Sequence, residues 1–134
     1  MKKGLWILLI ALALQAENIA WHSNYDKAHQ EALKEQKMLM VLLIKEDCPL
    51  CYKMLRTTFK DQPYLKKINE EFVSVLVTKS QKKSYPIEML YTMTYPSVFF
   101  LNSKELFVGE NIYGYADSDA FGKHLKSLIN EGPH

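Results

Sequence analysis

The sequence contains little cysteine, glycine or proline, and each shortage excludes a class of protein. It has two cysteines, five glycines and five prolines in 134 residues. Two cysteines cannot build a disulfide scaffold, and the overall composition excludes collagen-like, disordered and coiled-coil chains. Because 48% of the residues are hydrophobic, a chain of this length can bury a self-sufficient core. We therefore expect one globular domain.

The sequence also has almost no excess of charge of either sign. The formal net charge is +2, from 17 basic and 15 acidic residues. Lys2 and Lys3 provide this difference of two, so the rest of the chain is neutral. A neutral body without a basic stripe argues against nucleic acid as a partner, because the phosphate backbone binds strongly basic surfaces.

The first residues differ in character from the rest of the chain. Residues 1–3 (MKK) start with positive charge, residues 5–14 (LWILLIALAL) are all apolar, and residues 15–18 (QAEN) return to polarity around a small residue. This order is typical of a secretory signal peptide. A retained membrane anchor would need about 20 apolar residues, and this run is shorter.

We predict that residues 1–16 are a signal peptide cleaved after Ala16, with Ala13 and Ala20 as alternative sites. Residues 17–134 then form the exported domain. We expect this domain in the periplasm, without stable membrane insertion after cleavage. Its two cysteines would meet an oxidising environment there.

Hydrophobic patterns in the mature chain alternate between the strand period and the helix period. Apolar runs predict strands at residues 38–44 (MLMVLLI), 73–78 (VSVLVT) and 97–101 (SVFFL). Helices are expected at residues 25–36, 48–59, 63–72 and 86–93, and from a cap at 117 to 129. A turn at 102–104 leads to a hairpin strand at 106–109. This order predicts an α/β fold, with a central mixed sheet flanked by helices.

Several other side chains receive ordinary structural assignments. On the first helix, one face is expected to carry Tyr25, Ala28, Ala32, Leu33 and Gln36. Core positions, rather than a soft-metal site, are expected for Met38, Met40 and Met54. A solvated basic loop is expected around Lys79, Lys82 and Lys83, with docking of an acidic partner as the alternative.

The segment with the clearest chemistry is Cys48-Pro49-Leu50-Cys51, which follows a predicted strand and begins a predicted helix. Cysteines three positions apart on a first helical turn lie on the same side, close enough to join. If Pro49 is the first helical residue, Cys48 is the cap and its sulfur faces free backbone N–H groups. That position favours the thiolate, which attacks disulfides. Cys51, one turn inside, is placed to resolve the mixed disulfide.

Other interpretations of the two cysteines compete with this one. A purely structural disulfide would close a very small loop, for which chain entropy gives only about 2 kcal/mol. Haem attachment needs a histidine after the second cysteine, where this chain has Tyr52. A zinc or copper site needs more ligands, and the histidines show no matching spacing. We expect neither a metal nor a cofactor.

A second segment, Thr94-Tyr95-Pro96-Ser97, stands directly before the SVFFL strand. Together with the CxxC motif after a buried strand, it resembles the thioredoxin-like superfamily. The similarity is closer to stand-alone periplasmic thioredoxin-like proteins and to the C-terminal domain of the thiol:disulfide interchange protein DsbD. It extends over residues 21–129, through segments such as Thr58-Phe59-Lys60-Asp61 and Phe72-Val73-Ser74-Val75.

The resemblance implies a thioredoxin fold with an N-terminal helical extension and a redox-active Cys48–Cys51 disulfide. It also implies a cis Tyr95–Pro96 bond opposite the cysteines. We expect Pro49, Leu50, Tyr95 and Pro96 to contact the substrate. Tyr52, Tyr91 and Tyr95 would line an apolar rim for an extended polypeptide.

Two positions depart from the thioredoxin pattern, and the Pro49-Leu50 dipeptide also differs from the thioredoxin Gly-Pro. Asp47, preceded by Glu46, stands where thioredoxins usually carry tryptophan, and Leu42 stands where many hold a buried acid. We expect Glu46 and Asp47 to modulate the pKa of Cys48. Their negative charge opposes the thiolate that the helix terminus favours, so electrostatics alone does not fix the redox direction.

These observations predict an exported thiol-disulfide oxidoreductase that exchanges disulfides with envelope proteins, working as a reductase. The alternatives are an oxidase or isomerase of the same fold, and a non-catalytic binding module whose cysteines stay joined. The expected partners are protein thiols and disulfides together with an upstream membrane electron donor. We expect a monomer.

Overall fold

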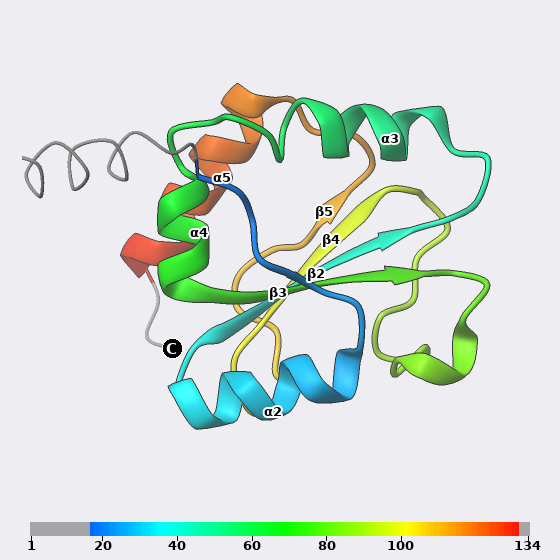
Figure 1. Cartoon of the computed structure of the whole chain (residues 1–134), viewed down its shortest axis with the longest axis horizontal. Coiled ribbons are helices and arrows are strands. Elements are labelled where there is room, and N and C mark those ends of the chain that lie inside the picture. The colour runs from blue at the N-terminus through cyan, green and yellow to red at the C-terminus, as the bar shows by residue number, and fades with distance from the viewer. Residues whose placement is uncertain (1–16, 132–134) are drawn as a thin grey trace, which may run out of the picture.

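The computed structural model describes residues 17–131, which form a five-stranded mixed sheet covered on both faces (Figure 1). The strand order is β1-β3-β2-β4-β5. Three strands are parallel, namely β1 (Trp21–His22), β3 (Phe72–Thr78) and β2 (Met38–Ile44). The last two, β4 (Ser97–Leu101) and β5 (Ile112–Tyr113), add to the sheet in antiparallel fashion. The α/β fold class and mixed sheet predicted from the sequence are confirmed.

The helices divide unequally between the two faces of the sheet (Figure 1). α2 (Tyr25–Glu35) covers one face. α3 (Pro49–Arg56), α4 (Leu65–Glu71) and α5 (Ser118–Glu131) cover the other. A short 3₁₀ helix, η1 (Lys82–Ser84), follows β3. No helix within residues 17–131 is long and apolar enough to cross a membrane.

The centre of the sheet is apolar on both sides because helices cover both of its faces. Along β2, Leu39, Val41 and Leu43 pack on the α2 side, and Met40 and Leu42 pack on the α3–α5 side. All seven residues of β2 pair in register with β3, from Met38 opposite Phe72 to Ile44 opposite Thr78. The core positions predicted for Met38, Met40 and Met54 are confirmed.

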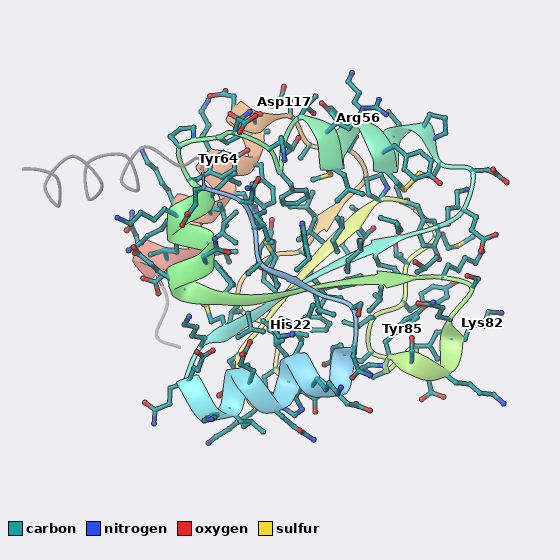
Figure 2. The ribbon with its side chains drawn as sticks, viewed as in Figure 1. His22, Arg56, Tyr64, Lys82, Tyr85 and Asp117 are labelled. Carbon is teal, nitrogen blue, oxygen red and sulfur yellow. A yellow bond between two sulfur atoms is a disulfide. The ribbon has the colours of Figure 1, made fainter. Side chains whose placement is uncertain are left out.

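Side chains cap the starts of α2 and α5, and the cap predicted at residue 117 is confirmed. The Asn24 side chain accepts a 2.9 Å hydrogen bond from the Lys27 N–H at the start of α2. The Asp117 carboxylate accepts one of 2.9 Å from the Ala120 N–H at the start of α5. Figure 2 labels Asp117 together with Tyr64, on the side of the molecule that α4 and α5 occupy.

The prediction of a helix at residues 86–93 is wrong. The chain makes one turn there, closed by a 3.0 Å hydrogen bond from the Leu90 N–H to the Pro86 carbonyl. It then departs from helical geometry because the Thr92 hydroxyl accepts the Thr94 N–H at 3.0 Å. Side-chain hydroxyls that bond nearby backbone groups compete with helix formation in this way.

The prediction of a hairpin strand at residues 106–109 is also wrong. Only Phe107 bridges to β4, opposite Leu101, and the regular partner strand is β5. Gly109 has φ +63°, which turns the chain out of the strand conformation. The Asn111 side chain then accepts the Phe100 N–H at 3.0 Å, in place of a backbone carbonyl.

The buried face of α2 is narrower than predicted. Tyr25, Ala28 and Ala32 are buried, but Leu33 is 50% exposed. Gln36 lies beyond the helix, in the left-handed conformation that ends it. α2 packs mainly against β1, β2 and β3. The stripe that it buries is therefore too narrow to include the next position around the helix.

Candidate active site

The CxxC segment joins the carboxyl end of β2 to the first turn of α3. Cys48 is the N-cap, with an extended backbone, and Pro49 begins the helix. A residue before proline is held in an extended conformation, and proline at the first helical position gives up an N–H that would have no partner. The Cys48 sulfur accepts a 3.2 Å hydrogen bond from the Cys51 N–H. The cap position predicted for Cys48 is confirmed.

Cys48 and Cys51 form a disulfide, with their Cα atoms 5.3 Å apart. Both side chains are buried, Cys51 fully and Cys48 at 4% exposure. Leu50, between them, is 49% exposed. Cys48 is therefore the less deeply buried of the two cysteines, and an exposed apolar side chain stands two positions after it.

The predicted proline loop lies against this disulfide. The Tyr95–Pro96 peptide bond is cis. The Tyr95 carbonyl oxygen lies 3.9 Å from the Cys48 sulfur. The structure thus brings together six of the predicted site residues, which are Cys48, Pro49, Leu50, Cys51, Tyr95 and Pro96.

A set of hydroxyl groups supports the proline loop, and the sequence prediction did not include it. The Ser97 hydroxyl, fully buried, donates a 2.6 Å hydrogen bond to the Thr94 carbonyl. The Thr92 hydroxyl lies 3.0 Å from that of Ser97 and also accepts the Thr94 N–H. The three hydroxyl residues that flank Tyr95-Pro96 were the available sequence signal.

Two lysines that were not among the predicted site residues, Lys45 and Lys79, approach Tyr95. The Lys45 and Lys79 ammonium groups lie 5.6 and 5.4 Å from the centre of the Tyr95 ring. Lys45 follows β2 and Lys79 follows β3, which are parallel neighbours. The carboxyl ends of parallel neighbours meet at one edge of a sheet, so the position of these lysines was a usable signal. Burial, with a smaller effect of Tyr91, raises the pKa of Tyr95 above its ordinary value.

The remaining predicted residues lie around this centre. Glu46 and Asp47 are exposed in the loop before Cys48, and neither forms an ion pair within residues 17–131. Asp47 adopts φ +53°, a left-handed conformation that aspartate tolerates better than most residues. Leu42 is fully buried in the core, so the position of the thioredoxin acid is apolar here.

The comparison with protein families agrees with this geometry. The model of the thioredoxin-like domain matches residues 25–129. The chain belongs to the thioredoxin-like family. Membership in this family implies protein thiols and disulfides as substrates in general, and the CxxC disulfide is at the expected position. No curated protein sequence matches the chain.

Solved structures of other family members share this fold at low sequence identity. A thioredoxin from Thermus thermophilus is 23% identical with a TM-score of 0.71, over 86% of this chain and 90% of its own. The oxidised C-terminal domain of DsbD from Neisseria meningitidis is 19% identical with a TM-score of 0.60, over 81% and 99%. The DsbH oxidoreductase is 18% identical with a TM-score of 0.64, over 87% and 88%. These likenesses support the fold alone.

Proposed function

We propose that this thioredoxin-like protein is an exported reductase of disulfides in other envelope proteins. The observation that carries the proposal is the position of the Cys48 sulfur. It caps α3, accepts the Cys51 N–H and lies 3.9 Å from the carbonyl of Tyr95. A sulfur at a helix N-terminus is stabilised as the thiolate, which is the attacking species in disulfide exchange.

In the first half of the reaction, the reduced protein attacks a substrate disulfide. The Cys48 thiolate forms a bond to one substrate sulfur, and the substrate S–S bond breaks. The leaving substrate thiolate takes a proton from solvent. The result is a mixed disulfide between Cys48 and the substrate.

In the second half, the Cys51 thiolate attacks the sulfur of Cys48. The Cys48–Cys51 disulfide forms, the mixed disulfide breaks, and the second substrate cysteine leaves as a thiol after protonation. Two electrons have passed from this protein to the substrate. An upstream dithiol donor, which we propose is a membrane protein, returns two electrons before the next cycle.

The two carboxylates before Cys48 favour the reducing direction, whereas the helix terminus acts in the opposite sense. Glu46 and Asp47 add negative charge close in sequence to the cap, and a negative charge disfavours a neighbouring thiolate. A weakly stabilised thiolate makes the dithiol form less stable relative to the disulfide. Such a couple is more reducing than one with a strongly depressed thiol pKa.

Export rests on the signal peptide expected at residues 1–16, which lie outside the residues that the structure describes. The apolar run between a basic start and a small residue supports secretion to the periplasm. N-terminal sequencing of the protein from a periplasmic fraction tests this, with Glu17 as the expected first residue.

The equilibrium reduction potential of Cys48–Cys51, measured against glutathione, tests the direction. A value of about −270 mV, as in thioredoxin, would support a reductase. A value of about −120 mV would indicate an oxidase instead. A disulfide that does not exchange with glutathione in the folded protein would indicate a non-catalytic binding module.

A further inference from the structure

A cavity of about 340 Å³ opens beside the proline loop, at the carboxyl ends of β2 and β3. Its buried floor is formed by Leu43, Tyr85 and Leu90. Exposed side chains of the loop before Pro96, including Ile87, Tyr91 and Met93, form an apolar side. The segment that carries η1 closes this end of the molecule, where Figure 2 labels Lys82 and Tyr85.

Three ammonium groups belong to the lining of this cavity, those of Lys45, Lys79 and Lys82. Two of them approach the ring of Tyr95, whose negative face attracts cations. The backbone of the same tyrosine contacts the Cys48 sulfur. Tyr95 therefore contacts both the positive charges, through its ring, and the redox-active disulfide, through its carbonyl.

No carboxylate of the described residues neutralises these lysines. None of the residues that line the cavity is acidic. Within residues 17–131, the lysine ion pairs are Lys67 with Glu71 and Lys123 with Asp119, both at the surface of other helices. Glu46, Asp47 and Glu88 are the nearest acids along the chain, and they neither line the cavity nor pair with a lysine.

We propose that this cavity binds an acidic side chain of the substrate polypeptide, close in sequence to the cysteine that Cys48 attacks. The inference rests on the proposed function, because it names the class of protein disulfide that the site accepts. A segment held along the Tyr95-Pro96 loop would place its neighbouring residues over the cavity. A glutamate or aspartate there meets uncompensated positive charge, whereas a lysine is repelled.

The test compares peptides that differ only in charge. Each peptide carries one cysteine joined to 2-mercaptoethanol, with glutamate, glutamine or lysine two or three residues from the cysteine on either side. The second-order rate constant for reduction by the dithiol form is measured at about 20 mM and about 500 mM salt. We expect at least one glutamate position to react about three- to tenfold faster than its glutamine counterpart at low salt, and less so at high salt.

Variants of the two lysines nearest Tyr95 locate the effect. In the Lys45→Gln/Lys79→Gln double variant, the glutamate-to-glutamine rate ratio is expected to fall to about one. The Lys45→Arg/Lys79→Arg double variant keeps the charge and is expected to keep the preference. Lys34→Gln, on α2 near the start of β2, is the matched control and should change nothing.

The outcomes separate this proposal from the function on which it depends. If the wild-type protein reduces no peptide, the proposed reductase function fails and the inference fails with it. If it reduces glutamate and glutamine peptides equally at low salt, only the inference is overturned. A preference for glutamate that persists in the folded Lys45→Gln/Lys79→Gln variant also overturns it. In that case residues other than these two lysines would bind the peptide carboxylate.

Discussion

The sulfur of Cys48 lies 3.9 Å from the carbonyl oxygen of Tyr95, although 47 positions separate the two residues in the chain. The contact joins the end of β2 to the loop before β4, which are antiparallel neighbours in the sheet. Ser97, the first residue of β4, pairs with Leu43 near the end of β2. The pairing of these two strands therefore sets the proline loop opposite the cysteines.

The first prediction concerns the roles of the two cysteines. Cys51→Ser should accumulate a mixed disulfide between Cys48 and a substrate protein, because no second thiol remains to release it. Cys48→Ser should accumulate none, since Cys51 is fully buried and cannot reach a substrate. Mass spectrometry of the trapped complexes identifies the linked residue. Complexes joined through Cys51 would reverse the assignment.

The second prediction concerns the hydroxyl groups that support the proline loop. Thr92→Val removes the hydroxyl that accepts the Thr94 N–H and lies beside Ser97, while keeping the shape of the side chain. We expect a loss of about 1–3 kcal/mol in the free energy of unfolding, because buried polar groups lose a partner. The rate of disulfide reduction should fall as well, and stopped-flow kinetics measures it.

Thr57→Val is the matched control for this change. Thr57 is the C-cap of α3, and its hydroxyl, exposed to solvent, donates to the Lys53 carbonyl. Its removal should cost less than about 0.5 kcal/mol. Equal effects of the two substitutions on the reduction rate would argue against a role for Thr92 in holding the loop.

The third prediction concerns the core between the sheet and α5. Phe121 is fully buried, with its ring centre 4.9 Å from that of Phe59 and 5.5 Å from that of Tyr64. Phe121→Ala should lower the free energy of unfolding by about 3–5 kcal/mol, through lost burial and the cavity left behind. Urea denaturation measures this. Leu33→Ala, at a half-exposed position, should cost far less, and a similar cost would contradict the described packing.

The fourth prediction concerns alkaline pH. The Tyr25 hydroxyl donates a 2.7 Å hydrogen bond to Glu105, which joins α2 to the turn after β4. Burial raises the pKa of Tyr25 well above its ordinary value of 10.0, and Glu105 raises it further by a smaller amount. Above about pH 10 the unfolded chain loses this proton while the folded chain keeps it. The stabilisation is thus complete below that pH and is lost as the pH rises towards the folded pKa.

The Tyr25→Phe variant lacks the titratable hydroxyl in both the folded and the unfolded chain. The difference in free energy of unfolding between the wild type and Tyr25→Phe should therefore shrink as the pH rises above about 10. Urea titrations at several alkaline pH values measure it. Tyr113→Phe, at an exposed position, should run parallel to the wild type, and a parallel course for Tyr25→Phe would contradict the assignment.

The elements that could be predicted from the sequence are those with a strong local signal. β2 is seven apolar residues in a row, and α3 begins at a proline directly after its cap. Both elements can therefore be predicted from the local sequence alone. β1 and β5 have two residues each and exist only because β3 and β4 offer hydrogen-bonding partners. No local pattern indicates strands of that length.

The candidate site divides in the same way. Cys48, Cys51 and Pro96 are marked by spacing and by their position next to strands. The approach of Lys45 and Lys79 to Tyr95 depends on which strands are neighbours and in what register, which single-sequence patterns do not specify. The hydroxyl contacts of Thr92 were missed because the segment before it has helical periodicity.

The register between β2 and β3 links substrate recognition to the packing of the core. Ile44 pairs with Thr78, and the Lys79 N–H donates a 2.8 Å hydrogen bond to the Ile44 carbonyl. Lys45 and Lys79 therefore leave the sheet at the same level. A slip of one residue would move Val75 and Val77 to the opposite face and separate the two charges. Substitutions deep in the sheet, remote from both cysteines, can thus alter which partners this protein selects while its disulfide remains intact.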